Sequence, residues 1–300
     1  MRALPPRVEE IGAQLLKELR EARRSLFFSI LLLVWAGLVV VEAQGFVSTS
    51  SVLPYLPAKV AAYEFWQQLL PVFGIFGLLG AVSISTEREH GTWDVLRASR
   101  VPLSSVLVGK FLFLALAGLV LVVLADSALF GSLALRGFAD PSGVFLTVPW
   151  ISLVVLPVWA QALFISSLFR RRLDSAISVL GVALVLGLAA STLYAQTYAS
   201  VQASLSANPL SEPGYVADLN FPWFVFAFLS LSPTYDLGIA SYGMHLLYGS
   251  TMGPVNGRLA PIDLGQQVLT SWGLYVAALA LQVLGFFGLA LWSVTRRGRP

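Results

Sequence analysis

The sequence predicts an all-α integral membrane protein, with an interfacial helix at the N-terminus followed by six membrane-spanning helices. Three observations predict this fold class. The chain has 300 residues, of which 57% are hydrophobic and 12% charged, whereas soluble domains carry about 25% charged residues. Apolar runs long enough to cross about 30 Å of hydrocarbon recur along the chain. All but three of its 19 Lys and Arg residues fall on one predicted side of the membrane. We therefore expect one transmembrane domain over residues 1–300.

The first predicted element is an amphipathic helix over residues 6–24. Its apolar residues recur at helical spacing and comprise Val8, Ile11, Leu15, Leu19 and Ala22, while charged residues fill much of the rest. We expect the apolar face to lie in the membrane interface and the charges in water. The alternative is a helix whose apolar face packs on another protein. The first 24 residues contain no apolar core of the length that a cleavable signal peptide requires.

Six membrane spans follow this helix. They are predicted at residues 26–43, 65–85, 108–134, 146–169, 175–196 and 270–293. The segment 197–269 is the long external loop, since most of it is polar or rich in turn residues. Within it, residues 221–231 are apolar and aromatic but too few to cross the membrane, so a short re-entrant or interfacial helix is predicted there.

The distribution of Lys and Arg predicts the orientation. Only Lys59, Arg136 and Arg258 fall on the opposite side from the rest. Cytoplasmic segments carry the excess of basic residues, so both termini and the connector 86–107 are predicted to be cytoplasmic. We expect a multi-pass protein of a prokaryotic-type plasma (inner) membrane. The pI near 9.3 reflects this topology, and we expect no nucleic-acid partner.

The connector between the second and third spans is short and densely charged. Charge costs several kcal/mol inside lipid, so this segment must lie in water at the membrane face. Glu87 and Glu89 can favour a helix N-terminus electrostatically, and Gly91 permits a turn. Trp93 and Leu96 are three residues apart, so they could form an apolar knob on one helical face. A knob surrounded by charge suits docking of a soluble partner. The alternative is an ordinary solvated loop.

This layout resembles the permease subunits of the ABC type-2 transporter family. Their connector typically reads Glu-x-Glu-x-Gly-Thr, then a leucine-rich turn, a Pro, and Gly-Lys at the start of the third span. The matching positions are Glu87, Glu89, Gly91, Thr92, Leu96, Gly109 and Lys110. Two departures stand out: Pro occurs at position 102, where the family pattern places it at position 100, and Trp93 replaces an aliphatic residue. Ser232-Pro233 is a weaker match. The resemblance covers the whole chain in layout but only this connector in motif.

The resemblance implies an exporter in which an ATPase grips the connector. The implied ATPase-coupling residues are Glu87, Arg88, Glu89, Gly91, Thr92, Trp93 and Leu96. It also implies two ABC ATPase subunits, which bind the ATP and Mg, and a second permease subunit, identical or homologous. The expected substrate is hydrophobic, lipid-like or a glycan, and nothing in the residues selects among these. Two other functions stay open: a membrane anchor that recruits the ATPase without passing substrate, and an ATP-independent channel or secondary carrier.

Enzymatic activity is not expected in this chain. A P-loop needs Gly-x4-Gly-Lys-Ser/Thr, but Gly109-Lys110 is followed by Phe111 and lacks the earlier Gly. The sequence has neither His-Glu-x-x-His nor Gly-x-Ser-x-Gly. His90 and His245 are predicted on opposite sides of the membrane, so they cannot share a metal. We expect no catalytic residues, no metal site and no cofactor in the chain itself.

Asp126 is the acid placed well inside a predicted span. A buried acid in lipid is costly and suggests a function, so Asp126 is a candidate pathway residue, together with Gln161 beside Pro157 in the fourth span. The alternative for Asp126 is a structural hydrogen bond to Ser127, to Ser132 or to a neighbouring helix.

Two further features concern packing and partners. Gly74, Gly77 and Gly80 form a strip of small residues that would let span two approach another helix, either in a second permease subunit or within the chain. The run 170–172 consists of three Arg residues, which we interpret as a topology anchor that attracts anionic membrane lipids or as a second contact with the ATPase. The loop 197–269 could contact an external partner.

Overall fold

The computed structural model describes residues 8–49, 77–99, 101–138, 140–186, 251–255, 258–262 and 265–296, together with Ala58, Ala61, Ala62, Phe65, Trp66 and Leu69. In this part of the chain nearly all residues are helical. The helices are α1 (Val8–Arg24), α2 (Leu26–Thr49), α4 (Gly77–Glu89), α5 (Thr92–Ala98), α6 (Leu103–Leu135), the 3-10 helix η3 (Pro141–Thr147), α7 (Val148–Leu168), a helix over residues 172–186, and α11 (Gly265–Arg296).

Four of the described helices are long and apolar enough to cross a membrane. These segments are Leu26–Ser48, Leu103–Leu135, Pro141–Leu168 and Leu279–Arg296. They agree with the first, third, fourth and sixth predicted spans and suggest a multi-pass membrane protein. The described parts of the second and fifth predicted spans are also helical, at residues 77–85 and 175–186. Six complete spans stay a prediction.

The long helices pack side by side around α6. Helix α6 contacts α1, α2, α7 and η3, and α7 also contacts α4 and α11. The largest buried side chains include Trp35, Trp66 and Trp159. Trp35 donates its indole N–H to the carbonyl of Leu121, 3.1 Å away, which fastens α2 to the middle of α6. By contrast, the outer face of α2 leaves Leu26, Leu33 and Val41 exposed, as expected for side chains that contact lipid.

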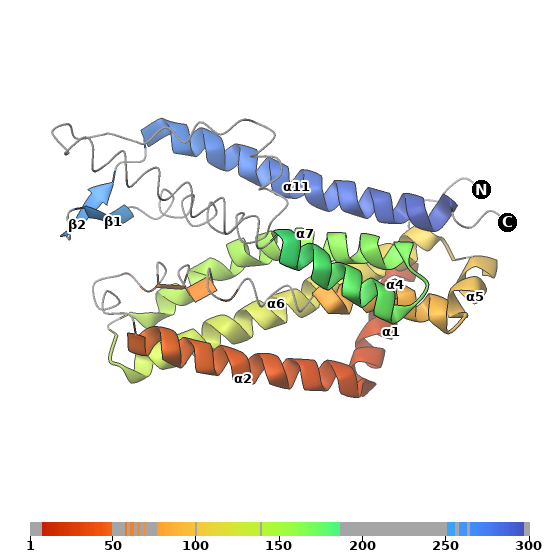
Figure 1. Ribbon diagram of the computed structural model, residues 1–300, viewed down its shortest axis with the longest axis horizontal. Helices are drawn as coiled ribbons and strands as arrows, with labels where there is room; N and C mark the ends of the chain where they lie inside the picture. Colours follow the sequence, from red (N-terminus) through yellow and green to blue (C-terminus); the bar gives the residue numbers. More distant parts are fainter. Residues whose placement is uncertain are drawn as a thin grey trace.

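Helix α5 and the last turn of α11 lie at one end of the bundle, near α1, and a small β-hairpin lies at the other end (Figure 1). The hairpin pairs β1 (Thr251–Val255) with β2 (Arg258–Ile262) in antiparallel register, from Thr251 opposite Ile262 to Val255 opposite Arg258. The sequence between the strands is Asn-Gly, the dipeptide that favours two-residue hairpin loops. The hairpin falls in the predicted external loop 197–269. The predicted helix over 221–231 lies outside the described residues.

Helix α1 begins at Val8 and ends at Arg24, close to the predicted helix over 6–24. Its environment differs from the expectation. Its buried side chains are the polar Gln14 and Glu18, whereas Val8 and Leu16 are exposed. The helix packs on α6, so Gln14 and Glu18 contact this chain's own bundle, whereas Arg20, Glu21 and Arg24 are exposed, as expected. The reason is a buried charge on α6, described next.

Candidate functional site

The connector folds into a tight turn followed by the two-turn helix α5. Helix α4 continues to Glu89, and Gly91 adopts a left-handed backbone conformation with φ of 74°. An L side chain is strained in this region, so the glycine is required for the reversal into α5. Thr92 Oγ1 donates to the carbonyl of Glu87 across 3.0 Å and closes the turn. The prediction that Gly91 makes a turn is confirmed. The connector was predicted over residues 86–107, with the third span from residue 108, whereas α6 already begins at Leu103, after Pro102.

A buried cluster of charges lies behind this turn. Lys110 is 2% exposed, and its Nζ is 2.6 Å from Oε1 of Glu18, 3.1 Å from Oε1 of Glu87 and 3.2 Å from the carbonyl of Ser83. Lys17 Nζ donates to the same oxygen of Glu87 across 3.0 Å. We call Lys17, Glu18, Glu87 and Lys110 the charge cluster. Two cations balance two carboxylates, so the cluster is neutral as a whole, and Lys17 is its half-buried member.

The cluster joins three helices that are far apart in the sequence. Lys17 and Glu18 come from α1, Glu87 from the end of α4, and Lys110 from the second turn of α6. Burial by itself lowers the pKa of Lys17, but the hydrogen bond and the charge of Glu87, with smaller effects of Glu21 and Glu18, outweigh it and raise that pKa above its usual value. Glu87 was predicted as a residue of the partner-contacting surface. This prediction is wrong for its side chain, which is buried against two lysines.

Close approach of α1 to α6 depends on Gly109. A Cβ atom at this position would lie 2.7 Å from Cβ and Cγ of Gln14 and 3.3 Å from the carbonyl oxygen of Ile11. Gln14 in turn donates to Oε1 of Glu18 across 2.7 Å. The Gly-Lys pair near the start of α6 therefore has a structural explanation. Gly109 leaves room for the close approach of α1, and Lys110 forms an ion pair with Glu18 of α1.

The replacement Gly109→Ala is expected to separate α1 from α6 and to lower thermal stability. Gly131→Ala is the matched control, because Gly131 lies on the same helix and an added Cβ would meet nothing within 4 Å. Both changes gain up to about 1 kcal/mol of helix propensity, so the difference between them reports the contact with Gln14. We expect Gly109→Ala to melt at lower temperature than Gly131→Ala, with faster proteolysis in α1. Equal behaviour of the two variants would contradict this packing.

A second group of contacts ties the turn to the end of α7. Arg88 donates through one guanidinium nitrogen to the carbonyls of Ser167 and Phe169, the latter 3.4 Å away, and its guanidinium lies 5.7 Å from the ring centre of Trp93. Glu89 Oε2 accepts from the backbone N–H of Arg172 across 3.1 Å and from its Nε across 2.9 Å. These two bonds lower the pKa of Glu89 below its usual value. Glu89 and Arg172 are exposed, so the pair orients the turn more than it stabilises the fold.

The predicted apolar knob is wrong in its residues. Trp93 is 1% exposed and Leu96 is half-buried, and both pack against the core of the bundle. They share one face of α5, as their spacing predicted, but this face points inward. The exposed residues here are His90 and Gly91 of the turn and Thr92, Asp94 and Val95 of α5. We call these five residues the α5 tip. Val95, at 70% exposed, is its apolar centre.

Asp126 is fully buried and bonded to neighbouring elements. Its Oδ1 accepts from the indole N–H of Trp66 across 2.7 Å, and its Oδ2 is 2.9 Å from the hydroxyl of Thr147 in η3. The neighbouring-helix alternative therefore describes its contacts, since Ser127 and Ser132 donate instead to carbonyls of their own helix. Gln161, the other candidate pathway residue, is half-buried on α7, two residues after the buried Trp159.

The described part of the glycine strip is used inside the chain. An added Cβ at Gly77 would lie 2.8 Å from Val179, and one at Gly80 would lie 2.7 Å from Cβ of Ala162. Helix α4 therefore packs on α7 and on the helix 172–186. The prediction that Gly77 and Gly80 pack on a second subunit is wrong, because side chains of this chain already fill the space beside them. Gly74 lies outside the described residues.

Hydroxyl groups strengthen the same contact. The backbone N–H groups of Ile84 and Ser85 both donate to Oγ of Ser166 across 3.0 Å, and Ser175 donates to the carbonyl of Ala81 across 2.8 Å. Small and hydroxylated residues commonly join helices in membranes in this way. Sequence reasoning missed these serines and also missed Lys17 and Glu18. A usable signal existed for the latter pair: a lysine in the second turn of an apolar helix needs a buried acid as partner.

Within the described residues, no group of three or more His, Asp or Glu side chains could hold a metal ion. His245 lies outside these residues. No protein-family model matches the chain, and no curated protein matches it in sequence.

Proposed function

We propose that this chain is the membrane-spanning permease subunit of an ATP-driven ABC transporter. In this proposal a separate ATPase docks on the α5 tip and drives export of a hydrophobic, lipid-like or glycan substrate. One observation carries the proposal: the short helix α5, which has an exposed outer face, follows directly on a helix end that the charge cluster ties to α1 and α6. An ordinary solvated loop needs no such support.

The contacts behind α5 support a mechanical role. Through Glu87 the turn is joined to Lys17 on α1 and to Lys110 on α6. Through Arg88 and Glu89 it is joined to the end of α7 and to Arg172 at the start of the next helix. A displacement of the α5 tip would therefore move both groups of helices. ATP binding drives such a displacement only if the ATPase contacts the tip differently in its two states.

The remaining parts of the proposal come from the resemblance to the ABC type-2 permeases. Two ATPase subunits hold the ATP and Mg, and a second permease subunit completes the pathway. Helices α5 and α1 and the end of α11 lie at the same end of the bundle (Figure 1), and in this proposal that end faces the cytoplasm. This orientation agrees with the excess of basic residues in these segments.

The test changes Val95, the exposed apolar centre of the tip. Val95→Asp introduces a charge where we expect an apolar contact, and taking an unpaired charge out of water at an interface costs several kcal/mol. The control is Val8→Asp, the same replacement at an 85% exposed valine on α1. We expect a P-loop protein to co-purify from native membranes with the wild type and with Val8→Asp, and at least tenfold less of it with Val95→Asp.

Two results would contradict the proposal. The first is a wild-type chain that retains no P-loop protein in mild detergent, even when candidate ATPases are added. The second is undiminished recovery with Val95→Asp at normal yield. Charge reversal at Glu87 is a poorer test, because Glu87 is 7% exposed and binds two lysines. Its loss would damage the fold before it reached any partner.

A further inference from the structure

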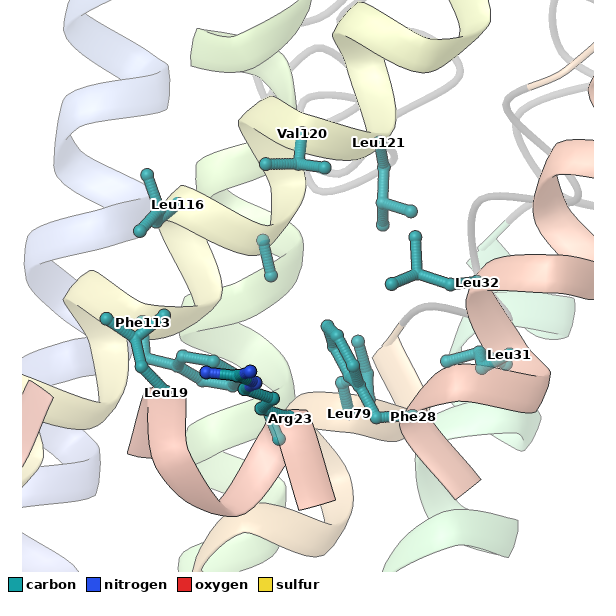
Figure 2. Close-up of a pocket in the computed structure, with 12 residues that line it drawn as sticks. Leu19, Arg23, Phe28, Leu31, Leu32, Leu79, Phe113, Leu116, Val120 and Leu121 are labelled. Carbon is teal, nitrogen blue, oxygen red and sulfur yellow. The ribbon is translucent and has the colours of Figure 1, made fainter. Parts of the chain in front are cut away.

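A pocket lies where α1 meets α2 and α6. It has a volume of about 230 Å³ and is partly open to the surface. Its walls are apolar and include Leu19, Phe28, Phe113, Leu116 and Leu121, contributed by all three helices (Figure 2). Small-molecule sites usually measure about 300–1,000 Å³. The volume of this pocket is below that range, so the pocket suits part of a narrow, flexible hydrocarbon chain better than a compact ligand.

One charged side chain belongs to the lining. Arg23 comes from the last turn of α1, and Figure 2 shows its guanidinium among the apolar side chains of the pocket. Within the described part of the chain no carboxylate forms an ion pair with it. A guanidinium beside an apolar crevice complements a molecule with an anionic head and a hydrocarbon tail, since its planar donors match phosphate oxygens.

The position of the pocket relative to the first membrane span indicates that such a molecule would be a lipid of the membrane. Arg23 lies three residues before Leu26, where the first membrane span begins. Among the lining residues, Leu19, Leu116 and Val120 are 38%, 42% and 46% exposed. In a membrane these side chains contact lipid, and Arg23 falls at the depth of the headgroups. The pocket therefore opens toward the bilayer.

We propose that this pocket binds one anionic phospholipid of the surrounding bilayer, with an acyl chain between α2 and α6 and the phosphate on Arg23. The bound lipid fills the space between the last turn of α1, α2 and α6, and it holds that end of α1 against the bundle. This site would exist in a transporter, an anchor or a channel, so it does not rest on the proposed function.

The test compares two lipids with the same acyl chains on the purified full-length chain. Dioleoyl phosphatidylglycerol is anionic and dioleoyl phosphatidylcholine is zwitterionic, and native mass spectrometry counts the copies bound to the delipidated protein. One basic residue near a charged lipid surface contributes about fivefold in binding. We expect the wild type to prefer phosphatidylglycerol by roughly this factor. Arg23→Gln should abolish the preference while still binding the acyl chain.

Two further variants keep the test decisive. Arg24→Gln removes the same charge from the neighbouring position, which is not part of the lining, and should keep the preference. Ala117→Phe fills the pocket, and we expect it to reduce binding of both lipids. The proposal is overturned if the wild type binds both lipids equally, if Arg23→Gln and Arg24→Gln lower the preference alike, or if Ala117→Phe folds normally and binds as before. Equal effects of the two arginines would mean only diffuse attraction to anionic lipid.

Discussion

Replacing Lys110 with Met is expected to lower the free energy of unfolding by about 3–5 kcal/mol, the usual cost of breaking a buried ion pair by removing one partner. Lys110 is 2% exposed and contacts both Glu18 and Glu87. Methionine fills a similar volume but leaves two carboxylates with only Lys17 to balance them. Unfolding of the purified chain in mixed detergent micelles would measure the loss, and proteolysis would show whether α1 detaches.

A triple variant separates the charge from the contact. Lys110→Met combined with Glu18→Gln and Glu87→Gln removes the uncompensated carboxylates while keeping their shapes. Since neutral replacement of a whole buried ion pair is often harmless, we expect this variant to recover most of the lost stability. A Lys110→Met chain as stable as the wild type would mean that the charge cluster does not hold α1. A triple variant as unstable as the single one would assign the loss to packing alone.

The second large effect is expected at Asp126. Asp126→Ala removes the acceptor of the Trp66 indole and the partner of the Thr147 hydroxyl, and leaves a space inside the bundle. Removing one partner of a buried hydrogen bond costs about 1–3 kcal/mol. We expect a loss of stability in this range, measured by the same unfolding experiment.

Asp126→Asn is the matched variant that distinguishes a structural role from a pathway role. The Thr147 hydroxyl has one proton, and it is also 2.8 Å from the carbonyl of Val144. When that proton goes to Val144, an amide at position 126 can donate to Thr147 and still accept from Trp66. We therefore expect Asp126→Asn to keep near wild-type stability and transport. Loss of transport at full stability would instead assign Asp126 to the pathway.

The helices themselves could be predicted from composition and periodicity. Apolar runs located α2, α6, α7 and α11, because only helices satisfy their backbone groups within one segment in lipid. Their ends were less predictable. Helix α6 begins at Leu103, five residues before the predicted span, because the helix continues beyond the apolar stretch to its start after Pro102. Hydropathy detects the part of a helix that is apolar, and not the turns that extend past it.

The candidate site was predictable in its location but not in its contacts. The connector was recognised from its charge and its Gly91 turn. Glu87 was assigned to the surface because a carboxylate in a short polar connector is usually solvated. The structure instead pairs it with Lys17 and Lys110, from helices 70 and 23 residues away along the chain. No local pattern specifies which cation a carboxylate finds.

Helix α5 illustrates the division between sequence and tertiary structure. From the sequence alone, the spacing of Trp93 and Leu96 determined that they share a helical face, because side chains three apart on a helix are neighbours. Periodicity identifies a face but contains nothing about what covers it. The packing of α4, α5 and α7 decided that this face is buried, which left Val95 outward. Likewise, a lysine inside an apolar helix needs a buried acid as its partner, but only the fold brought Glu18 to Lys110, since an ion pair needs proximity in space and not in sequence.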